Sequence, residues 1–132
     1  MTRRVSLIPI CLLLLAASAQ AQSEAVVALK SAKSIYVKSS SLLVGRSVIE
    51  EKLQKRSEFS QMGLVLTRSE RDADIILEVH HDRLTKYVYT AIDSKRNIVV
   101  ASGKLSSLGG TVAGKVAKRF MKQVMQARAT GP

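Results

Sequence analysis

The sequence predicts an α+β domain, a two-layer sandwich with the element order β-α-β-β-β-β-α, in which two helices lie on one face of a mixed, mostly antiparallel sheet. Three observations support this prediction. Several short runs alternate apolar and polar residues, as half-buried strands do. The last long segment repeats apolar residues at intervals of four, which indicates an amphipathic helix. Between residues 10 and 131 there is no proline to interrupt these elements.

The first strand and the first helix follow from local patterns. Residues 34–38 alternate like a strand. Ser47 and Glu50 have the spacing of a capping box, in which each side chain satisfies a backbone N–H of the first turn, so a helix is expected from there to about Glu58. Gly63 then ends this segment.

Further alternating or β-branched runs predict four more strands, at residues 63–68, 74–80, 86–92 and 98–105. The polar run 93–97 joins the last two strands as a hairpin. Gly103 indicates a bulge or a close approach within its strand. The last helix begins near Thr111, and its apolar positions repeat at Val112, Val116, Phe120 and Val124.

The first residues indicate export. A basic start, an apolar run and the small residues around Ala21 predict a secretory signal peptide at residues 1–21, cleaved after Ala21. Cleavage removes Cys11, the sole cysteine, and leaves a soluble periplasmic or secreted chain. The remaining segments are an N-terminal extension, a single α/β domain and a disordered tail, at residues 22–33, 34–127 and 128–132.

The chain is strongly basic, with 21 Lys and Arg against 10 Asp and Glu and a net charge of +11. Loss of Arg3 and Arg4 with the signal leaves +9. A basic exported protein meets acidic proteins, anionic polymers or lipid headgroups. Four cations share one face of the last helix and form a candidate anion or partner surface: Lys115, Lys118, Arg119 and Lys122.

The stretch GGTVAGKV, residues 109–116, has part of the spacing of a phosphate-binding loop. Val116 replaces the hydroxyl residue that would hold magnesium, and no room follows for a second magnesium-binding strand. We therefore expect no nucleotide and no cofactor, and we interpret the glycines as a turn into the last helix. Tyr87 and Tyr89 could stack bases, but export and ordinary strand packing argue against nucleic acid.

His80, His81 and Asp82 form the one histidine cluster, which we expect in a hairpin turn after the third strand. Adjacent strand residues point to opposite faces, so His80 would share a face with Glu78 and not with His81. His80 and Glu78 are thus candidate metal ligands, but two ligands are one fewer than a catalytic zinc site uses. No nucleophile and base can be paired, so no catalytic residue is assigned and no enzyme is predicted.

The order of features resembles a group of small exported bacterial domains. The features that carry this resemblance are a capped helix, the strand Ala73–Val79, the hairpin Tyr89–Lys104 and a Gly-rich entry into a terminal helix. This pattern is similar to the amino-terminal domain of the translocation protein TolB, to the curli-secretion lipoprotein and to lipoprotein activators of penicillin-binding proteins. The resemblance implies a non-enzymatic envelope domain that binds proteins, and no functional residue transfers with it.

Together these patterns predict an exported, non-enzymatic binding module that acts through an unidentified protein partner in the cell envelope. The alternative is an electrostatic binder of anionic cell-surface polymer or lipid headgroups, and a small hydrolase or metal-binding protein is a third reading. An exposed sheet edge could also add a strand from a second copy and form a homo-oligomer.

Overall fold

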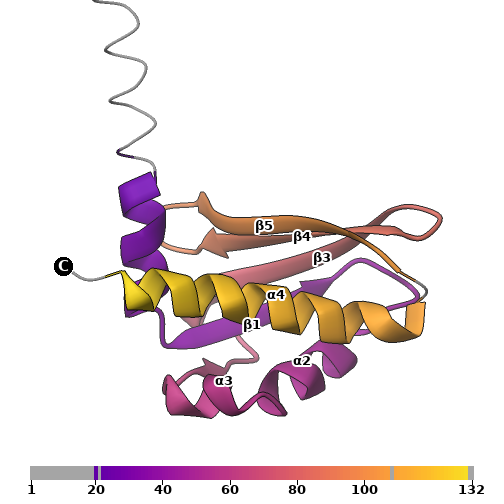
Figure 1. Cartoon of the computed structure of the whole chain (residues 1–132), viewed down its shortest axis with the longest axis horizontal. Coiled ribbons are helices and arrows are strands. Elements are labelled where there is room, and N and C mark those ends of the chain that lie inside the picture. Colours follow the sequence, from indigo (N-terminus) through magenta and orange to yellow (C-terminus); the bar gives the residue numbers. More distant parts are fainter. Residues whose placement is uncertain (1–19, 21, 108, 131–132) are drawn as a thin grey trace, which may run out of the picture.

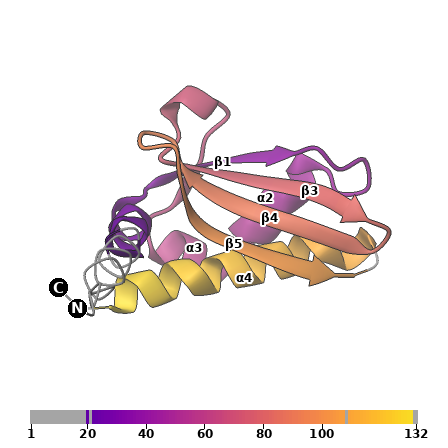
Figure 2. The same cartoon turned by 90° about the horizontal axis from the view of Figure 1, so that it is seen from above.

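The computed structural model describes residue 20, residues 22–107 and residues 109–130. The expected signal peptide and its cleavage site at Ala21 lie outside the described residues, apart from residue 20. The described chain is a two-layer α+β sandwich, as the sequence predicts. In Figure 1 the long C-terminal helix crosses in front of a single twisted sheet, with two shorter helices below it, and Figure 2 shows the same sheet and helix layers from above.

The sheet has five strands in the order β2-β1-β3-β4-β5. Their bounds are β1 (Ser34–Ser39), β2 (Val65–Leu66), β3 (Ile75–Arg83), β4 (Lys86–Asp93) and β5 (Ile98–Ser106). β1 runs parallel to both β2 and β3, whereas β3, β4 and β5 form an antiparallel meander. The parallel pairings arise because helices connect β1 to β2, and β2 itself is much shorter than the predicted strand 63–68.

The helices are α2 (Arg46–Gln54), α3 (Ser57–Gln61) and α4 (Gly109–Ala129), with a short 3₁₀ helix η1 (Glu70–Asp72) between β2 and β3. α2, α3 and α4 cover one face of the sheet (Figures 1 and 2). The N-terminal extension is helical over residues 22–31 and packs at one end of the sandwich. Ala28 and Leu29 of this segment are buried in the core, so the segment is part of the folded domain.

The capping-box prediction was wrong. α2 begins at Arg46 with Gly45 as its N-cap, and no side chain caps it. Glu50 instead pairs with Arg46, whose Nε lies 2.7 Å from the Glu50 carboxylate. The helix also ends before Glu58, because Arg56 is extended, with φ −81° and ψ 126°, and the chain restarts as α3. Gly63 ends that segment with φ 68°, as expected.

The predicted hairpin turn at residues 80–82 was also wrong. β3 continues through His80 and His81, which lie opposite Val88 and Tyr87 on β4. The turn consists of residues 84 and 85, since Arg83 pairs with Lys86. Leu84 occupies this turn with φ 45°, a left-handed conformation that disfavours leucine. Extension of the strand past the predicted turn reflects cross-strand pairing that local sequence does not reveal.

α4 packs its apolar positions against the sheet and forms the centre of the core. The predicted set, Val112, Val116, Phe120 and Val124, is buried throughout. The helix also begins at Gly109, so the glycines of the GGTVAGKV stretch lie in helix and do not form a separate turn. It extends beyond the expected boundary at residue 127. Arg128 explains this extension, because it donates to the carbonyls of Met62 and Ala32 at 2.8 and 2.7 Å.

Gly103 lies in β5 where the ring of Tyr89 crosses it, which confirms the predicted close approach. A Cβ atom built on Gly103 would lie 2.5 Å from Tyr89 Cε1. The ring cannot easily move away, because Tyr89 is 1% exposed and its hydroxyl donates to Gln123 Oε1 at 2.9 Å.

We therefore predict that Gly103→Ala destabilises the fold by about 1–3 kcal/mol, the usual cost of overpacking a filled site. Gly114→Ala is the matched control, because nothing lies within 4 Å of its added Cβ. This second change should stabilise α4 by roughly 0.5–1 kcal/mol. Urea unfolding of both variants measures the difference, and equal stability of Gly103→Ala and the unaltered protein would contradict the packing described.

Candidate binding surface

The four cations predicted on α4 form one exposed stripe, called here the cationic stripe: Lys115, Lys118, Arg119 and Lys122. They occupy positions i, i+3, i+4 and i+7, opposite the buried apolar face. The 21 residues of α4 include five Lys and Arg and no Asp or Glu. Within the described part of the chain, no carboxylate forms an ion pair with Lys115, Lys118 or Lys122.

Helix α2 and the residue that follows it use their charges differently. On α2, Arg46 pairs with Glu50, and Lys55 pairs with Glu51, each at a spacing of four residues. Such pairs stabilise a helix by a few tenths of a kcal/mol, and like charges at the same spacing destabilise it by a similar amount. The cationic stripe therefore lowers the stability of α4 instead of adding to it, so its composition calls for another explanation.

Two polar side chains of α4 fix its position against the edge strand β5. Arg119 Nη1 donates to the Lys104 carbonyl at 2.7 Å, and Gln123 Nε2 donates to the Ser102 carbonyl at 3.0 Å. Burial raises the pKa of Tyr89, which donates to the same Gln123. Arg119 thus has a structural bond, whereas the three lysines of the stripe remain available to a partner.

The predicted metal candidates do lie together, on the sheet face away from α2, α3 and α4. Glu78 and His80 line one shallow hollow with Lys38 and Ser40. Lys38 Nζ lies 3.8 Å from the Glu78 carboxylate and 3.7 Å from that of Glu70. Among the described residues, no group of three or more His, Cys, Asp and Glu could hold a metal ion. Glu78 is held by an ammonium group, which competes with a cation for the same oxygen atoms.

His81 lies on the opposite face from His80, as the strand period predicts. Its ring stacks on Tyr87, with ring centroids 4.7 Å apart, and its Nε2 contacts the Leu84 carbonyl. Tyr87 and Tyr89 are both buried, so neither presents a ring for stacking with a base. The environment of His81 is that of a packed cross-strand pair.

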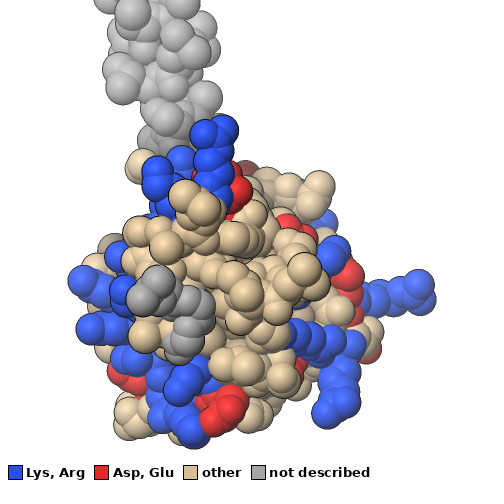
Figure 3. Space-filling model, turned by 90° about the vertical axis from the view of Figure 1, so that its right-hand side faces the viewer, with Lys and Arg blue, Asp and Glu red and all other residues tan. Residues whose placement is uncertain are grey.

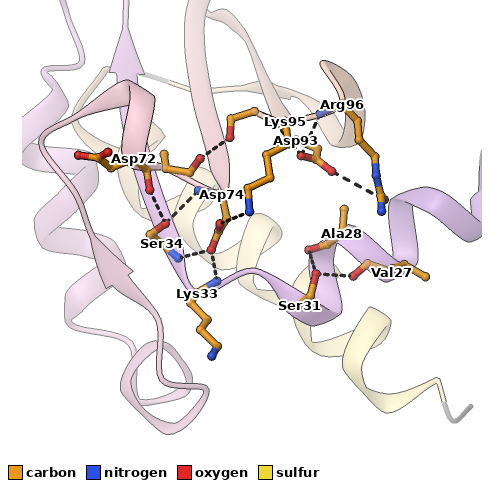
Figure 4. Close-up of polar contacts among 12 residues, drawn as sticks. Val27, Ala28, Ser31, Lys33, Ser34, Asp72, Asp74, Asp93, Lys95 and Arg96 are labelled. Carbon is orange, nitrogen blue, oxygen red and sulfur yellow. Dashed lines mark hydrogen bonds and ion pairs between the residues drawn. The ribbon is translucent and has the colours of Figure 1, made fainter.

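A hollow of about 230 Å³ near the start of β3 contains two aspartates that sequence patterns did not place together (Figure 4). Asp74 accepts hydrogen bonds from the backbone N–H groups of Lys33 and Ser34 at 2.9 and 3.2 Å. Asp93 accepts from the backbone N–H groups of Lys95 and Arg96 at 3.0 and 3.4 Å. The Asp74 carboxylate thus fixes the start of β1 beside the start of β3, and the Asp93 carboxylate fixes the turn between β4 and β5. Both aspartates therefore have structural roles in this hollow.

Burial alone would raise the pKa of Asp74. The backbone hydrogen bonds from Lys33 and Ser34, together with the nearby Lys95 ammonium, outweigh burial and hold this pKa below its usual range. A lowered folded-state pKa means that ionised Asp74 stabilises the fold at pH values above its unfolded pKa. This contribution disappears as the pH falls through the folded-state pKa.

We predict that Asp74→Asn lowers the free energy of unfolding by about 1–3 kcal/mol at neutral pH. The difference from the unaltered protein should shrink as the pH falls below the ordinary aspartate pKa of about 3.9 and through the lower folded-state pKa of Asp74. Urea unfolding at a series of pH values measures it. Asp72→Asn is the control, because Asp72 contacts Ser34 through its backbone carbonyl. A pH-independent difference for Asp74→Asn would contradict the assigned ionisation.

No family model matches the chain, and no curated protein matches it. Solved structures with a distant likeness to the chain include the following. A PelC variant dodecamer from Paraburkholderia phytofirmans is 15% identical, with a TM-score of 0.42, 74% of this chain covered and 90% of that one. A second PelC dodecamer from the same organism is 12% identical, with a TM-score of 0.38 and coverages of 78% and 91%.

The third is the uncharacterized lipoprotein B from Nitrosomonas europaea, 13% identical, with a TM-score of 0.32 and coverages of 74% and 81%. At these identities and TM-scores the likenesses assign the chain to no family. The resemblance to TolB, the curli-secretion lipoprotein and the penicillin-binding-protein activators remains a prediction. No helix in the described ranges has both the length and the apolarity needed to cross a membrane.

Proposed function

We propose that the chain is an exported, non-enzymatic binding module whose partner is an anionic component of the cell envelope, such as a polymer or a lipid headgroup surface. The observation that carries this proposal is the cationic stripe on α4. α4 carries five Lys and Arg and no Asp or Glu. None of its three lysines forms an ion pair with a described carboxylate, whereas Arg46 of α2 pairs with Glu50, and Lys55, just after α2, pairs with Glu51. A negatively charged partner would supply the missing counter-charges.

The buried face of α4 strengthens this reading. Because Val116, Phe120 and Val124 are locked into the core, the helix cannot rotate to redistribute its lysines. The lysines are therefore held as a preorganised row along the helix axis, and an extended anionic partner could contact several of them at once. Many weak contacts of this kind give binding that falls steeply as salt concentration rises.

We predict that replacing Lys115, Lys118 and Lys122 together with Gln weakens binding to dextran sulfate by roughly a hundredfold at low salt, at about 1 kcal/mol per cation. The matched control replaces Lys33, Arg68 and Arg71 with Gln, which removes the same charge elsewhere. Titration of residues 22–132 with the polymer provides the measurement. Equal losses in the two triple variants would show that net charge alone, and no particular surface, drives binding.

A protein partner is the second candidate, and a different observation favours it. An apolar row crosses four strands on the sheet face away from α2, α3 and α4: Tyr36, Ile76, Ile92 and Val99. Each is the register neighbour of the next. Val99 is 58% exposed and the other three are half-buried. A packed partner could cover this row, and such contacts would persist at high salt.

For this candidate we predict that an envelope protein captured by residues 22–132 stays bound through a high-salt wash and is lost with Val99→Asp. Val48→Asp on α2 is the matched control, since Val48 is also exposed, 43%, but lies in the helix layer. Capture that is insensitive to Val99→Asp would remove the support for this face as a protein-binding surface.

Strand addition at β5 is not favoured as a route to a homo-oligomer. The carbonyls of Ser102 and Lys104 accept hydrogen bonds from Gln123 and Arg119 of α4. An added strand would have to break these bonds before pairing with β5. At the other edge, β2 offers only two residues.

A further inference from the structure

Three leucine side chains, called here the leucine tip, are exposed at one end of the molecule: Leu42, Leu43 and Leu84. Their exposed fractions are 103%, 65% and 89%, whereas Leu53 and Leu77 are fully buried. They follow the carboxyl ends of β1 and β3, which are parallel neighbours and therefore end on the same side of the sheet. The described chain begins and ends at the opposite end (Figure 1), which leaves this end open.

Folding does not account for these leucines. Leu84 lies in a two-residue hairpin turn with φ 45°, a position where Asn or Gly would be better accommodated. The side chain gains no burial there in exchange for this unfavourable conformation. An exposed leucine that opposes local backbone preference indicates that the side chain serves contact with another molecule.

Hydrogen bonds within the loop that carries Leu42 and Leu43 fix its conformation. Ser39 Oγ donates to the Val44 carbonyl at 2.5 Å, and Val44 is buried. The N–H of Leu43 donates to Ser41 Oγ at 3.2 Å. These bonds hold the loop in shape while the two leucine side chains point outward.

Cations border the leucine tip. Arg83 and Lys86 flank Leu84 in sequence, and Lys104 lies on the strand next to Lys86. Lys86, Lys104 and Asp82 line a hollow of about 270 Å³ beside the tip. Figure 3 views this end directly and shows a broad uncharged centre whose border carries many Lys and Arg side chains with some Asp and Glu among them. Asp82 is the acid among these residues, so the immediate surroundings of Leu84 are net positive.

We infer that the leucine tip docks on a lipid bilayer that contains anionic phospholipids. The leucines enter the boundary between headgroups and acyl chains, and Arg83, Lys86 and Lys104 contact the lipid phosphates. Apolar side chains surrounded by cations match the chemistry of such a surface, because apolar burial and attraction to anionic headgroups act at one place. The inference shares an anionic partner with the proposed function but uses the leucine tip and not the cationic stripe.

The test measures partition of residues 22–132 onto vesicles of phosphatidylcholine and phosphatidylglycerol in equal parts. Leu84→Asn should weaken partition roughly tenfold, because one leucine no longer enters the bilayer. The same change should raise the melting temperature, since Asn suits the left-handed turn. Greater stability with weaker vesicle binding separates docking from a structural role. Leu42→Ser should weaken partition similarly.

Val65→Ser is the matched control, because Val65 is exposed but lies on β2 near the opposite end of β1. It should leave partition unchanged. All leucine variants should retain their affinity for dextran sulfate, which offers charge without an apolar interior. If Leu84→Asn and Leu42→Ser bind these vesicles as the unaltered protein does, the inference is overturned, while polymer binding lost in the stripe variant would still support the proposed function.

Discussion

The packing of α4 against the sheet is the constraint on which the rest of the structure depends. Its apolar face fills the centre of the core, with Phe120 and Val116 fully buried. The same helix closes the edge of β5 through Arg119 and Gln123. At its far end, Arg128 joins α3 to the N-terminal helical segment through two carbonyls. Because core packing and these hydrogen bonds fix the orientation of α4, its lysines face the solvent.

The polar groups of this protein divide into those that the fold uses and those that it leaves available. Asp74 and Asp93 accept backbone hydrogen bonds at chain crossings, and Glu78 pairs with Lys38. These three carboxylates thereby have structural partners. What the fold leaves available includes the three lysines of the cationic stripe and the leucine tip, and both are costly for folding alone. This contrast supports the binding role proposed above.

The sequence predicted the layered architecture, the apolar face of α4, the close approach at Gly103 and the exposed stripe, because each follows from a strong local periodicity or from one unusual residue. It did not predict where α2 begins or where β3 turns. Gly45 replaces the expected cap, and cross-strand pairing carries β3 past His81. The leucine tip also escaped sequence reasoning, because Leu42 and Leu84 are placed at the same end of the sheet only once β1 and β3 are known to be parallel neighbours.

The measurement that tests the central claim most directly is an NMR titration of isotope-labelled residues 22–132 with an anionic polymer, followed through each backbone amide. The account predicts that the largest shift changes fall at Lys115, Lys118 and Lys122, that they saturate together, and that added salt reverses them. Changes centred instead on Tyr36, Ile76 and Ile92, on the open sheet face, would contradict it. They would assign binding to the apolar row and leave the lysines of α4 without a role in it.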